Sequence, residues 1–204
     1  TSLDHEDDDP GTTWNERART REPGKMSPRM AWRAITSVLP KDAIISSDIG
    51  NNCAIGNAYP TFEEGRKYLA PGLFGPCGYG FPAICGAKIA QPDVPVVGFA
   101  GDGAFGISMN EMVSVGRDEW PPITMIIFRN YQWGAEKRNT TLWFDDNFVG
   151  TELDTDVTYA GIAQQCGVKG VQVDGMDALA EALDKAIEAQ MKDCLLYTSD
   201  AADE

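Results

Sequence analysis

Histidine and paired cysteines are the first features that this sequence lacks. Its single histidine, His5, lies in a polar N-terminal stretch, and its five cysteines show no CxxC spacing. Structural zinc sites need Cys and His ligands at short, regular spacings, so we expect no such site. An odd number of cysteines also does not suit a secreted disulfide framework, and we interpret them as reduced thiols of a cytoplasmic protein. They are Cys53, Cys77, Cys85, Cys166 and Cys194.

Basic charge and long apolar runs are also scarce. The formal net charge is −14 at pH 7, whereas nucleic acids and anionic membrane surfaces bind basic footprints. No apolar run approaches the ~20 residues that a membrane-spanning helix needs. The chain opens with the acidic TSLDHEDDDPG, which is unlike a signal peptide. We therefore expect neither a nucleic-acid partner nor a membrane.

The central part of the sequence alternates apolar strands with helices. A helix is predicted in SPRMAWRAITSVLP, where Ser27 suits the N-cap, Pro28 the first turn, and Pro40 ends the apolar spacing. Strands alternating with helices imply an α/β fold in three layers, a mostly parallel sheet with helices on both faces. The predicted strands lie in DAIISSDIG, VPVVGFAGDG, ITMIIFRN and VKGVQVDG, and a last amphipathic helix is predicted in MDALAEALDKAIEAQM.

The two ends of the sequence differ from this pattern. Residues 1–25 contain three consecutive aspartates, scattered Pro and Gly, and few apolar residues. We expect them to be a linker from an upstream domain. The tail CLLYTSDAADE, residues 194–204, interrupts the last helix and resembles the translation of a transposon-based sequencing adapter. We therefore expect one domain over residues 26–193, followed by a non-native tail.

Two polar residues directly follow two of the predicted strands. Asp102 comes after the apolar run 95–100 and is flanked by glycines, and Asn130 comes after the run 123–128. The intervening residues leave room for a helix and a return strand. Parallel strands joined in this way end at the same edge of a sheet, where open α/β sheets bind ligands. The sequence therefore predicts that Asp102 and Asn130 lie side by side.

The chemistry of this pair favours a magnesium-bound diphosphate. Carboxylate and amide oxygens are hard donors that suit Mg²⁺, which typically takes one or two carboxylates together with substrate phosphates. Gly101 and Gly103 let the backbone approach a ligand closely, and the N-terminus of the following helix favours anionic oxygens. GDG alone is also common in turns. A dinucleotide site is a poor competitor, because GFAGDGAFG lacks GxGxxG in register.

Three ordered segments resemble the thiamine-diphosphate enzyme family. GDG with its strand-ending Asn resembles the family's metal–diphosphate motif, and SDIGNN (47–52) resembles the turn placed against the diphosphate. GPCGYGFPAICGA (75–87) resembles the glycine loop that grips the aminopyrimidine ring. The resemblance covers residues 43–193. It implies the thiamine-diphosphate-binding fold, with thiamine diphosphate and Mg²⁺ as cofactors.

The resemblance also implies roles for individual residues. The Mg²⁺ ligands would be the side chains of Asp102 and Asn130 and the backbone carbonyl of Gln132. The carbonyl of Gly75 would accept from the 4′-amino group, and Cys77 stands where the family usually has a bulky apolar residue. The residues implied to contact the cofactor are Gly50, Asn51, Asn52, Gly75, Cys77, Gly101, Asp102, Gly103, Ala104 and Asn130. Arg129 stands where the family commonly has another asparagine.

The segment after the second strand indicates a branch of the family. YQWGAEKRN (131–139) is unlike acetolactate synthases and simple 2-oxoacid decarboxylases. Residues 126–144, IIFRNYQWGAEKRNTTLWF, together with residues 48–80, DIGNNCAIGNAYPTFEEGRKYLAPGLFGPCGYG, resemble the branch that converts sulfoacetaldehyde and phosphate into acetyl phosphate and sulfite. A carboligase or decarboxylase of the same family is the alternative, and a non-catalytic cofactor-binding subunit is the alternative of another class. The resemblance implies a homodimer or homotetramer.

The remaining expectations concern catalysis and substrate binding. No catalytic residue is assigned in this chain, because the Glu that activates the cofactor is expected in the pyrimidine-binding domain of a second subunit. Lys137 and Arg138 are candidates for contact with the small anionic substrates, since Arg forms forks on multi-oxygen anions. A solvated basic turn is the alternative for this pair. Trp143, Phe144 and Phe148 are expected in a flap or a subunit interface.

Overall fold

The structure is a computed structural model that describes residues 26–62, 65, 67–192 and 197–202. The linker predicted over residues 1–25, His5 and Cys194 lie outside the described residues. In chain order the described elements are α2 (Pro28–Val38), β1 (Ile44–Ser47), α3 (Asn51–Gly56), β2 (Tyr68–Leu69), α4 (Gly80–Ala90), β3 (Val96–Gly101), α5 (Asp102–Ser108), the 3-10 helix η2 (Met109–Glu111), α6 (Met112–Val115), β4 (Thr124–Arg129), α7 (Gly134–Trp143), α8 (Tyr159–Gln165), β5 (Lys169–Gln172), α9 (Met176–Met191) and β6 (Tyr197–Ala202).

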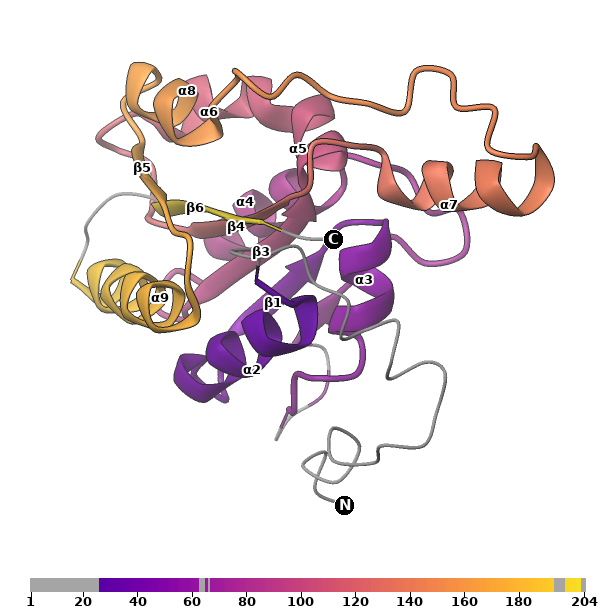
Figure 1. The fold of residues 1–204 in the computed structure, drawn as a ribbon. Helices are drawn as coiled ribbons and strands as arrows, with labels where there is room; N and C mark the ends of the chain where they lie inside the picture. The colour runs from indigo at the N-terminus through magenta and orange to yellow at the C-terminus, as the bar shows by residue number, and fades with distance from the viewer. Residues whose placement is uncertain (1–25, 63–64, 66, 193–196, 203–204) are drawn as a thin grey trace.

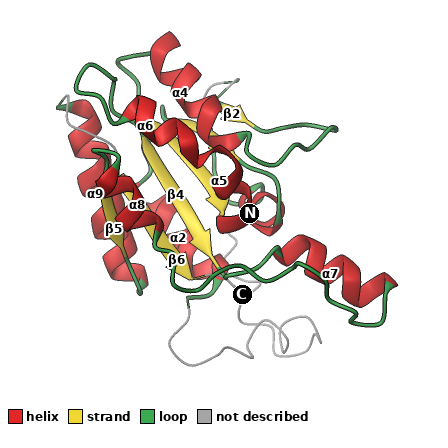
Figure 2. Ribbon diagram, turned by 90° about the horizontal axis from the view of Figure 1, so that it is seen from above, coloured by secondary structure: helices red, strands yellow, loops and turns green. Residues whose placement is uncertain are grey.

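The strands form one parallel sheet in the order β2-β1-β3-β4-β6-β5. Helices cover both of its faces, with α4, α5, α6 and α8 on one side and α2 and α9 on the other (Figures 1 and 2). This arrangement confirms the predicted three-layer α/β fold. The four strands predicted from apolar runs are β1, β3, β4 and β5.

The alternation of side chains along β4 shows how one strand serves both cores. Met125 and Ile127 pack in the cluster under α4, α5, α6 and α8, whereas Ile126 and Phe128 pack in the cluster over α2 and α9. Successive side chains of a strand point to opposite faces, so a strand covered on both faces must be apolar throughout. Each large side chain buried in this way contributes about 1.5–3 kcal/mol.

Helix α2 is positioned mainly by burial of its apolar face. Ser27 occupies the predicted N-cap with Pro28 in the first turn, but the Ser27 side chain makes no capping hydrogen bond. Trp32 is fully buried, and its ring lies 4.5 Å from that of Phe99 and 5.7 Å from that of Phe128, measured between centroids. Aromatic packing against β3 and β4 therefore holds this helix to the sheet.

Two predicted segments differ locally from the structure. The crossover after β3 was predicted as a helix, and it is divided into α5, η2 and α6. The break falls at Ser108, whose backbone (φ −114°, ψ 4°) leaves the helical region. The turn predicted in SDIGNN is shorter than expected: Gly50 adopts φ 125°, which glycine alone reaches easily, and α3 begins at the next residue.

Residues 197–202 form a strand although they belong to the tail expected to be non-native. β6 pairs with β4 over Thr124–Arg129 and with β5 over Lys169–Gln172. It therefore joins β5 to the rest of the sheet. The domain boundary at residue 193 stays a prediction. Backbone pairing does not show whether residues 197–202 are native to the domain, because strands of many different sequences can form the same hydrogen bonds.

Helix α7 extends from the body of the molecule (Figure 1). The exposed fractions of its last apolar side chains are large: 63% for Leu142 and 76% for Trp143, followed by 66% for Phe144 just after the helix. Among the residues that the structure describes, no helix combines the length and the apolar composition needed to cross a membrane.

Candidate functional site

An open cavity lies at the carboxyl ends of β1, β3 and β4. The chain leaves β1 toward β2 on one side and later returns to β3 on the other, so this is the point where the strand order reverses. Ligands of open α/β sheets bind at such points. Every residue predicted for the cofactor or the metal lines the cavity: Gly50, Asn51, Asn52, Gly75, Cys77, Gly101, Asp102, Gly103, Ala104, Asn130 and Gln132.

Asp102 joins the end of β3 to the loop that follows β4. Its carboxylate is 3% exposed; Oδ1 accepts from the Gly103 N–H at 3.0 Å and Oδ2 from the Tyr131 N–H at 2.7 Å. Burial raises the pKa of Asp102, while these two N–H groups and the charge of Arg129 act in the opposite direction. A direct hydrogen bond thus joins Asp102 to Tyr131, the residue that follows Asn130.

The loop after β4 is held in a strained conformation. Tyr131 has φ 60°, which is uncommon for a residue other than glycine. The Asn130 Oδ1 accepts from the Gln132 N–H at 3.3 Å, and Gln132 forms an isolated antiparallel bridge with Glu152. Strain of this kind persists where surrounding contacts fix it, and it gathers at functional sites.

Two glycines give the cavity its floor. A Cβ at Gly103 would lie 2.9 Å from the Trp133 ring. A Cβ at Gly134 would lie 2.9 Å from the Asn130 Nδ2 and 3.0 Å from the Asn51 Nδ2. The side-chain amides of Asn51 and Asn130 therefore lie so close to position 134 that a side chain there would collide with both.

The donor set at this floor fits a hard cation that brings its own oxygen ligands. It offers the Asp102 carboxylate, the Asn130 amide oxygen and the Gln132 carbonyl. In the part of the chain that the structure describes, no group of three or more His, Cys, Asp or Glu could hold a metal. A cation here would need further oxygens from a phosphate group and water, which is how Mg²⁺ is usually bound. The residues present therefore fit a Mg²⁺–diphosphate group.

The glycine loop 75–80 closes the other side of the cavity. Gly75 (φ 58°) and Gly78 (φ 84°) both adopt the left-handed region. Gly75 and Cys77 line the cavity, and the Cys77 thiol is exposed. Partial burial, with the negative charges of Asp48 and Glu136, raises the pKa of Cys77. The loop thus presents backbone groups and an un-ionised thiol.

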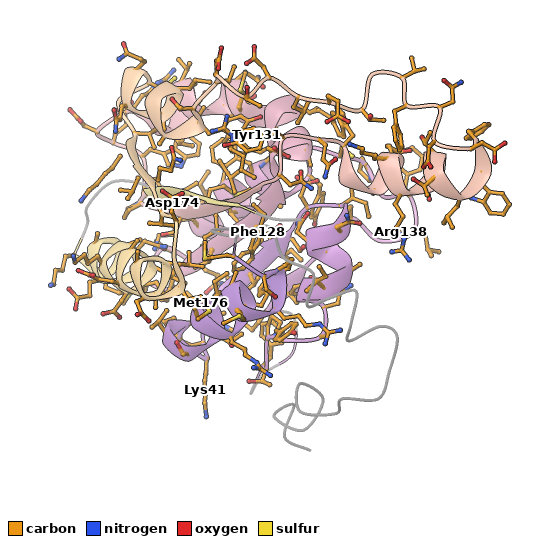
Figure 3. The ribbon with its side chains drawn as sticks, in the orientation of Figure 1. Lys41, Phe128, Tyr131, Arg138, Asp174 and Met176 are labelled. Atoms are coloured by element: carbon orange, nitrogen blue, oxygen red, sulfur yellow. The ribbon has the colours of Figure 1, made fainter. Side chains whose placement is uncertain are left out.

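The basic pair predicted for substrate contact does not line this cavity. Lys137 Nζ lies 2.6 Å from Glu152 Oε1, and 5.1 Å from the centroid of the Phe148 ring. Arg138 lies out on α7, away from Phe128 and Tyr131 near the strand ends (Figure 3). Both residues belong to α7 rather than to a turn. Their contact with anionic substrates remains a prediction.

Arg129 has a role that its sequence position does not reveal. It is 4% exposed, and its Nη2 donates to the carbonyl of Thr155 at 3.2 Å and to that of Val157. Its guanidinium carbon lies 4.3 Å from the centroid of the Tyr131 ring. Arg129 therefore ties the segment returning from α7 to the Asp102–Tyr131 loop.

The cavity also contains residues that the sequence did not single out for it. Glu136 lines it, as do Ile49, Phe128, Gly134 and Ala135. In the sequence these residues were marked only by their closeness to the predicted strand ends. That closeness does not show which side chains face a ligand.

Comparisons with known proteins agree with this geometry. The family profile "Thiamine pyrophosphate enzyme, C-terminal TPP binding domain" matches residues 48–196. The chain is 75% identical over 189 residues to the sulfoacetaldehyde acetyltransferase of Roseovarius nubinhibens, covering 93% of this chain and 31% of that protein. It is 74% identical over 189 residues to the protein of the same name from Rhodobacter capsulatus, covering 93% and 32%. The chain thus spans about a third of these relatives.

A solved structure has the same fold. The thiamine diphosphate-dependent 4-hydroxybenzoylformate decarboxylase of Rhodococcus jostii RHA1 superposes with a TM-score of 0.80 at 21% identity. The match covers 90% of this chain and 34% of that one. With the family profile covering most of the chain and its motifs gathered at one cavity, the chain belongs to the thiamine pyrophosphate enzymes, through their C-terminal TPP-binding domain.

Proposed function

We propose that residues 26–193 form the diphosphate- and Mg²⁺-binding domain of a longer enzyme that converts sulfoacetaldehyde and phosphate into acetyl phosphate and sulfite. The observation that supports this reaction is the sequence identity of 74–75% to two sulfoacetaldehyde acetyltransferases over 93% of the chain. The observation that supports the binding role is the meeting of Asp102, Asn130 and the Gly50–Asn52 turn at one cavity.

Each part of the cavity has a place in this proposal. Asp102 and Asn130 would hold Mg²⁺ by their side chains and Gln132 by its carbonyl. The amides of Gly103 and Ala104 would face the diphosphate from the first turn of α5, where N–H groups have no helical acceptors; the Gly103 N–H, which donates to Asp102 Oδ1, would be shared between the two acceptors. When bound, thiamine diphosphate would supply the nucleophilic carbon and the electron sink that cleavage of the carbon–sulfur bond requires. Sulfite would depart with the carbon–sulfur bonding electron pair, the aldehyde carbon would lose its proton, and the carbon that carried the sulfonate would gain one. The resulting acetyl group would then be transferred to a phosphate oxygen.

The proposal includes a second subunit. We place the activating Glu in a pyrimidine-binding domain of that subunit, in a homodimer or homotetramer. The exposed Leu142 and Trp143 on α7 and Phe144 just after it support an interface, since contiguous exposed apolar side chains commonly mark contact sites. We keep the cytoplasm as the proposed location, because Cys53, Cys77, Cys85 and Cys166 are free thiols.

The proposal is tested on the full-length enzyme that contains this chain. The enzyme, with Mg²⁺ and thiamine diphosphate, is incubated with sulfoacetaldehyde, with and without phosphate. We expect sulfite and acetyl phosphate in equal amounts, formed only when phosphate is present. The same preparation without Mg²⁺ and cofactor is the control.

The other outcomes favour the alternatives. Release of carbon dioxide from pyruvate, without sulfite from sulfoacetaldehyde, would assign the chain to a carboligase or decarboxylase. Tight cofactor binding with turnover of neither substrate would favour a non-catalytic cofactor-binding subunit. Failure to bind thiamine diphosphate would contradict the proposed site itself.

A further inference from the structure

Asp48 is a buried carboxylate that lies just outside the cavity. It follows β1 directly and has no exposed surface. Its Oδ1 accepts from the Gly78 N–H at 3.0 Å and from the Ile49 N–H at 2.9 Å. Its Oδ2 accepts from the Gly80 N–H at 2.7 Å. Burying an ionisable group is costly unless hydrogen bonds compensate it, and here backbone N–H groups do so.

Two of these three donors belong to the glycine loop 75–80. Gly78 has φ 84°, a conformation that turns its N–H inward without strain only because it is glycine. A Cβ at Gly80 would lie 3.1 Å from the Cβ and Oδ2 of Asp48, so the loop fits closely around the carboxylate. Gly80 also begins α4, and its N–H would otherwise have no helical partner.

The backbone of Asp48 connects this loop to the opposite wall of the cavity. Its N–H donates to the Phe99 carbonyl of β3 at 2.7 Å. Its carbonyl accepts from the Asn52 Nδ2 at 3.3 Å, and Asn52 lines the cavity. Asp48 thus links the end of β1 to β3, to Asn52 in the turn 47–52, and to the glycine loop 75–80.

We propose that Asp48 is a positioning residue whose carboxylate sets where the glycine loop presents Gly75 and Cys77 to the cavity. This inference rests on the proposed function, in which that loop faces the thiamine rings while Asp102 and Asn130 hold the diphosphate. Asp48 would therefore govern how tightly the ring part of the cofactor is held. It would have little effect on the diphosphate part.

Asp48→Asn tests the role of the carboxylate at nearly constant volume. An amide has one acceptor oxygen, and its NH₂ group would oppose one of the inward N–H donors. The full-length enzyme is titrated by calorimetry with thiamine diphosphate, and separately with inorganic pyrophosphate, both with Mg²⁺. The matched control is Asp42→Asn, an exposed aspartate at the other end of β1.

We expect Asp48→Asn to weaken thiamine diphosphate binding at least about fivefold, the effect of leaving a buried partner unsatisfied. Pyrophosphate affinity should remain within about twofold of the control, because the Asp102 side of the cavity is untouched. Equal weakening of both ligands would show a merely structural role and overturn the proposal. Unchanged binding of both would also overturn it.

A second pair of variants covers the case in which Asp48→Asn does not fold. Gly80→Ala forces a Cβ against the Asp48 carboxylate, whereas Gly86→Ala in the same helix meets no atom within 4 Å. We expect Gly80→Ala, but not Gly86→Ala, to weaken thiamine diphosphate selectively. Identical binding in the two variants would overturn the role of Asp48. If the unmutated enzyme binds neither ligand, the proposed function fails instead.

Discussion

Asp102 is oriented by the protein before any ligand arrives. Each of its carboxylate oxygens already accepts one backbone N–H, from Gly103 and from Tyr131. Its own carbonyl accepts from the Tyr159 hydroxyl at 2.8 Å. A carboxylate oxygen accepts more than one bond, so each oxygen keeps a lone pair for a cation. Pre-orientation of this kind reduces the entropy lost when a ligand binds.

The first prediction therefore concerns the charge of Asp102. In the full-length enzyme, Asp102→Asn should weaken Mg²⁺-dependent retention of thiamine diphosphate by at least about tenfold, since even indirect partners of a metal are worth about 10–100-fold. The measurement is the cofactor that remains bound after gel filtration in buffer with Mg²⁺. The matched control is Asp118→Asn, an exposed aspartate before β4. Retention equal to that of the control would contradict the metal site.

The second prediction concerns the thiols. Burial raises the pKa of Cys85 to about 12, and partial burial together with nearby negative charge also raises the pKa of the exposed Cys77. Only the thiolate is alkylated, so modification of Cys77 should accelerate about tenfold per pH unit between pH 7 and 9. Cys85 should remain largely unmodified over this range. Peptide mass spectrometry after iodoacetamide treatment measures both sites.

Ligand protection separates the cavity thiol from the others. Because Cys77 lines the cavity, thiamine diphosphate with Mg²⁺ should slow its alkylation in the full-length enzyme. Cys166 is partly buried outside the cavity and provides the internal control. Faster labelling of Cys85 than of Cys77, or a Cys77 rate that ignores pH, would contradict this prediction.

At the scale of elements, the local sequence was sufficient to predict a strand or helix wherever its own pattern of apolar residues shows which of its faces are buried. The runs around Val96–Gly101 and Thr124–Arg129 are apolar throughout, and both strands are covered on both faces. The length of the segment between these two strands then predicted that they are parallel. Parallel neighbours end at the same edge of the sheet, which placed Asp102 and Asn130 near each other. Most of the candidate site was predictable because it stands at strand ends.

Contacts between distant segments could not be predicted in the same way. Asp48 meets Gly78 and Gly80 across 30 and 32 residues, and no local pattern marks that pairing. Arg129 is buried where its guanidinium donates to the carbonyls of Thr155 and Val157. That contact depends on the path of the chain between α7 and α8. The ion pair of Lys137 could not be predicted from its charge alone, since its partner Glu152 lies in the segment after α7.

The ends of α6 and α8 approach each other closely through backbone atoms. Gly116 follows α6, and a Cβ there would lie 1.9 Å from the Cys166 carbonyl oxygen at the end of α8. The nearby Gly167 adopts φ 81°. Two helix ends therefore meet closely because neither carries a side chain at the point of contact.

The third prediction follows from that contact. Gly116→Ala should lower the free energy of unfolding by about 1–3 kcal/mol, because backbone atoms must move apart. Gly86→Ala, in open space on α4, should raise it by about 0.4–1 kcal/mol through reduced entropy of the unfolded chain. Urea unfolding of the chain, followed by circular dichroism, compares the two. Equal effects would show that the close approach does not exist in solution.

At the scale of the whole molecule, β6 is the strand least suited to its place. It lies between β4 and β5, and both α8 and α9 contact it. Interior strands of parallel sheets are usually near-continuous apolar runs. Residues Tyr197–Ala202 instead read YTSDAA, with three polar residues in succession. This mismatch supports the proposal that residues 194–204 are foreign to the domain.

The last prediction tests that mismatch. A variant with Thr198→Val, Ser199→Val and Asp200→Val should raise the free energy of unfolding by about 1 kcal/mol, because β-branched residues suit a strand better than Ser or Asp does. The control is Thr155→Val with Asp156→Val in an exposed loop, where changes should stay within about 0.5 kcal/mol. Urea unfolding of both variants and the unmutated chain measures the difference. A β6 variant that is no more stable than the unmutated chain would contradict the inferred mismatch between this sequence and an interior strand.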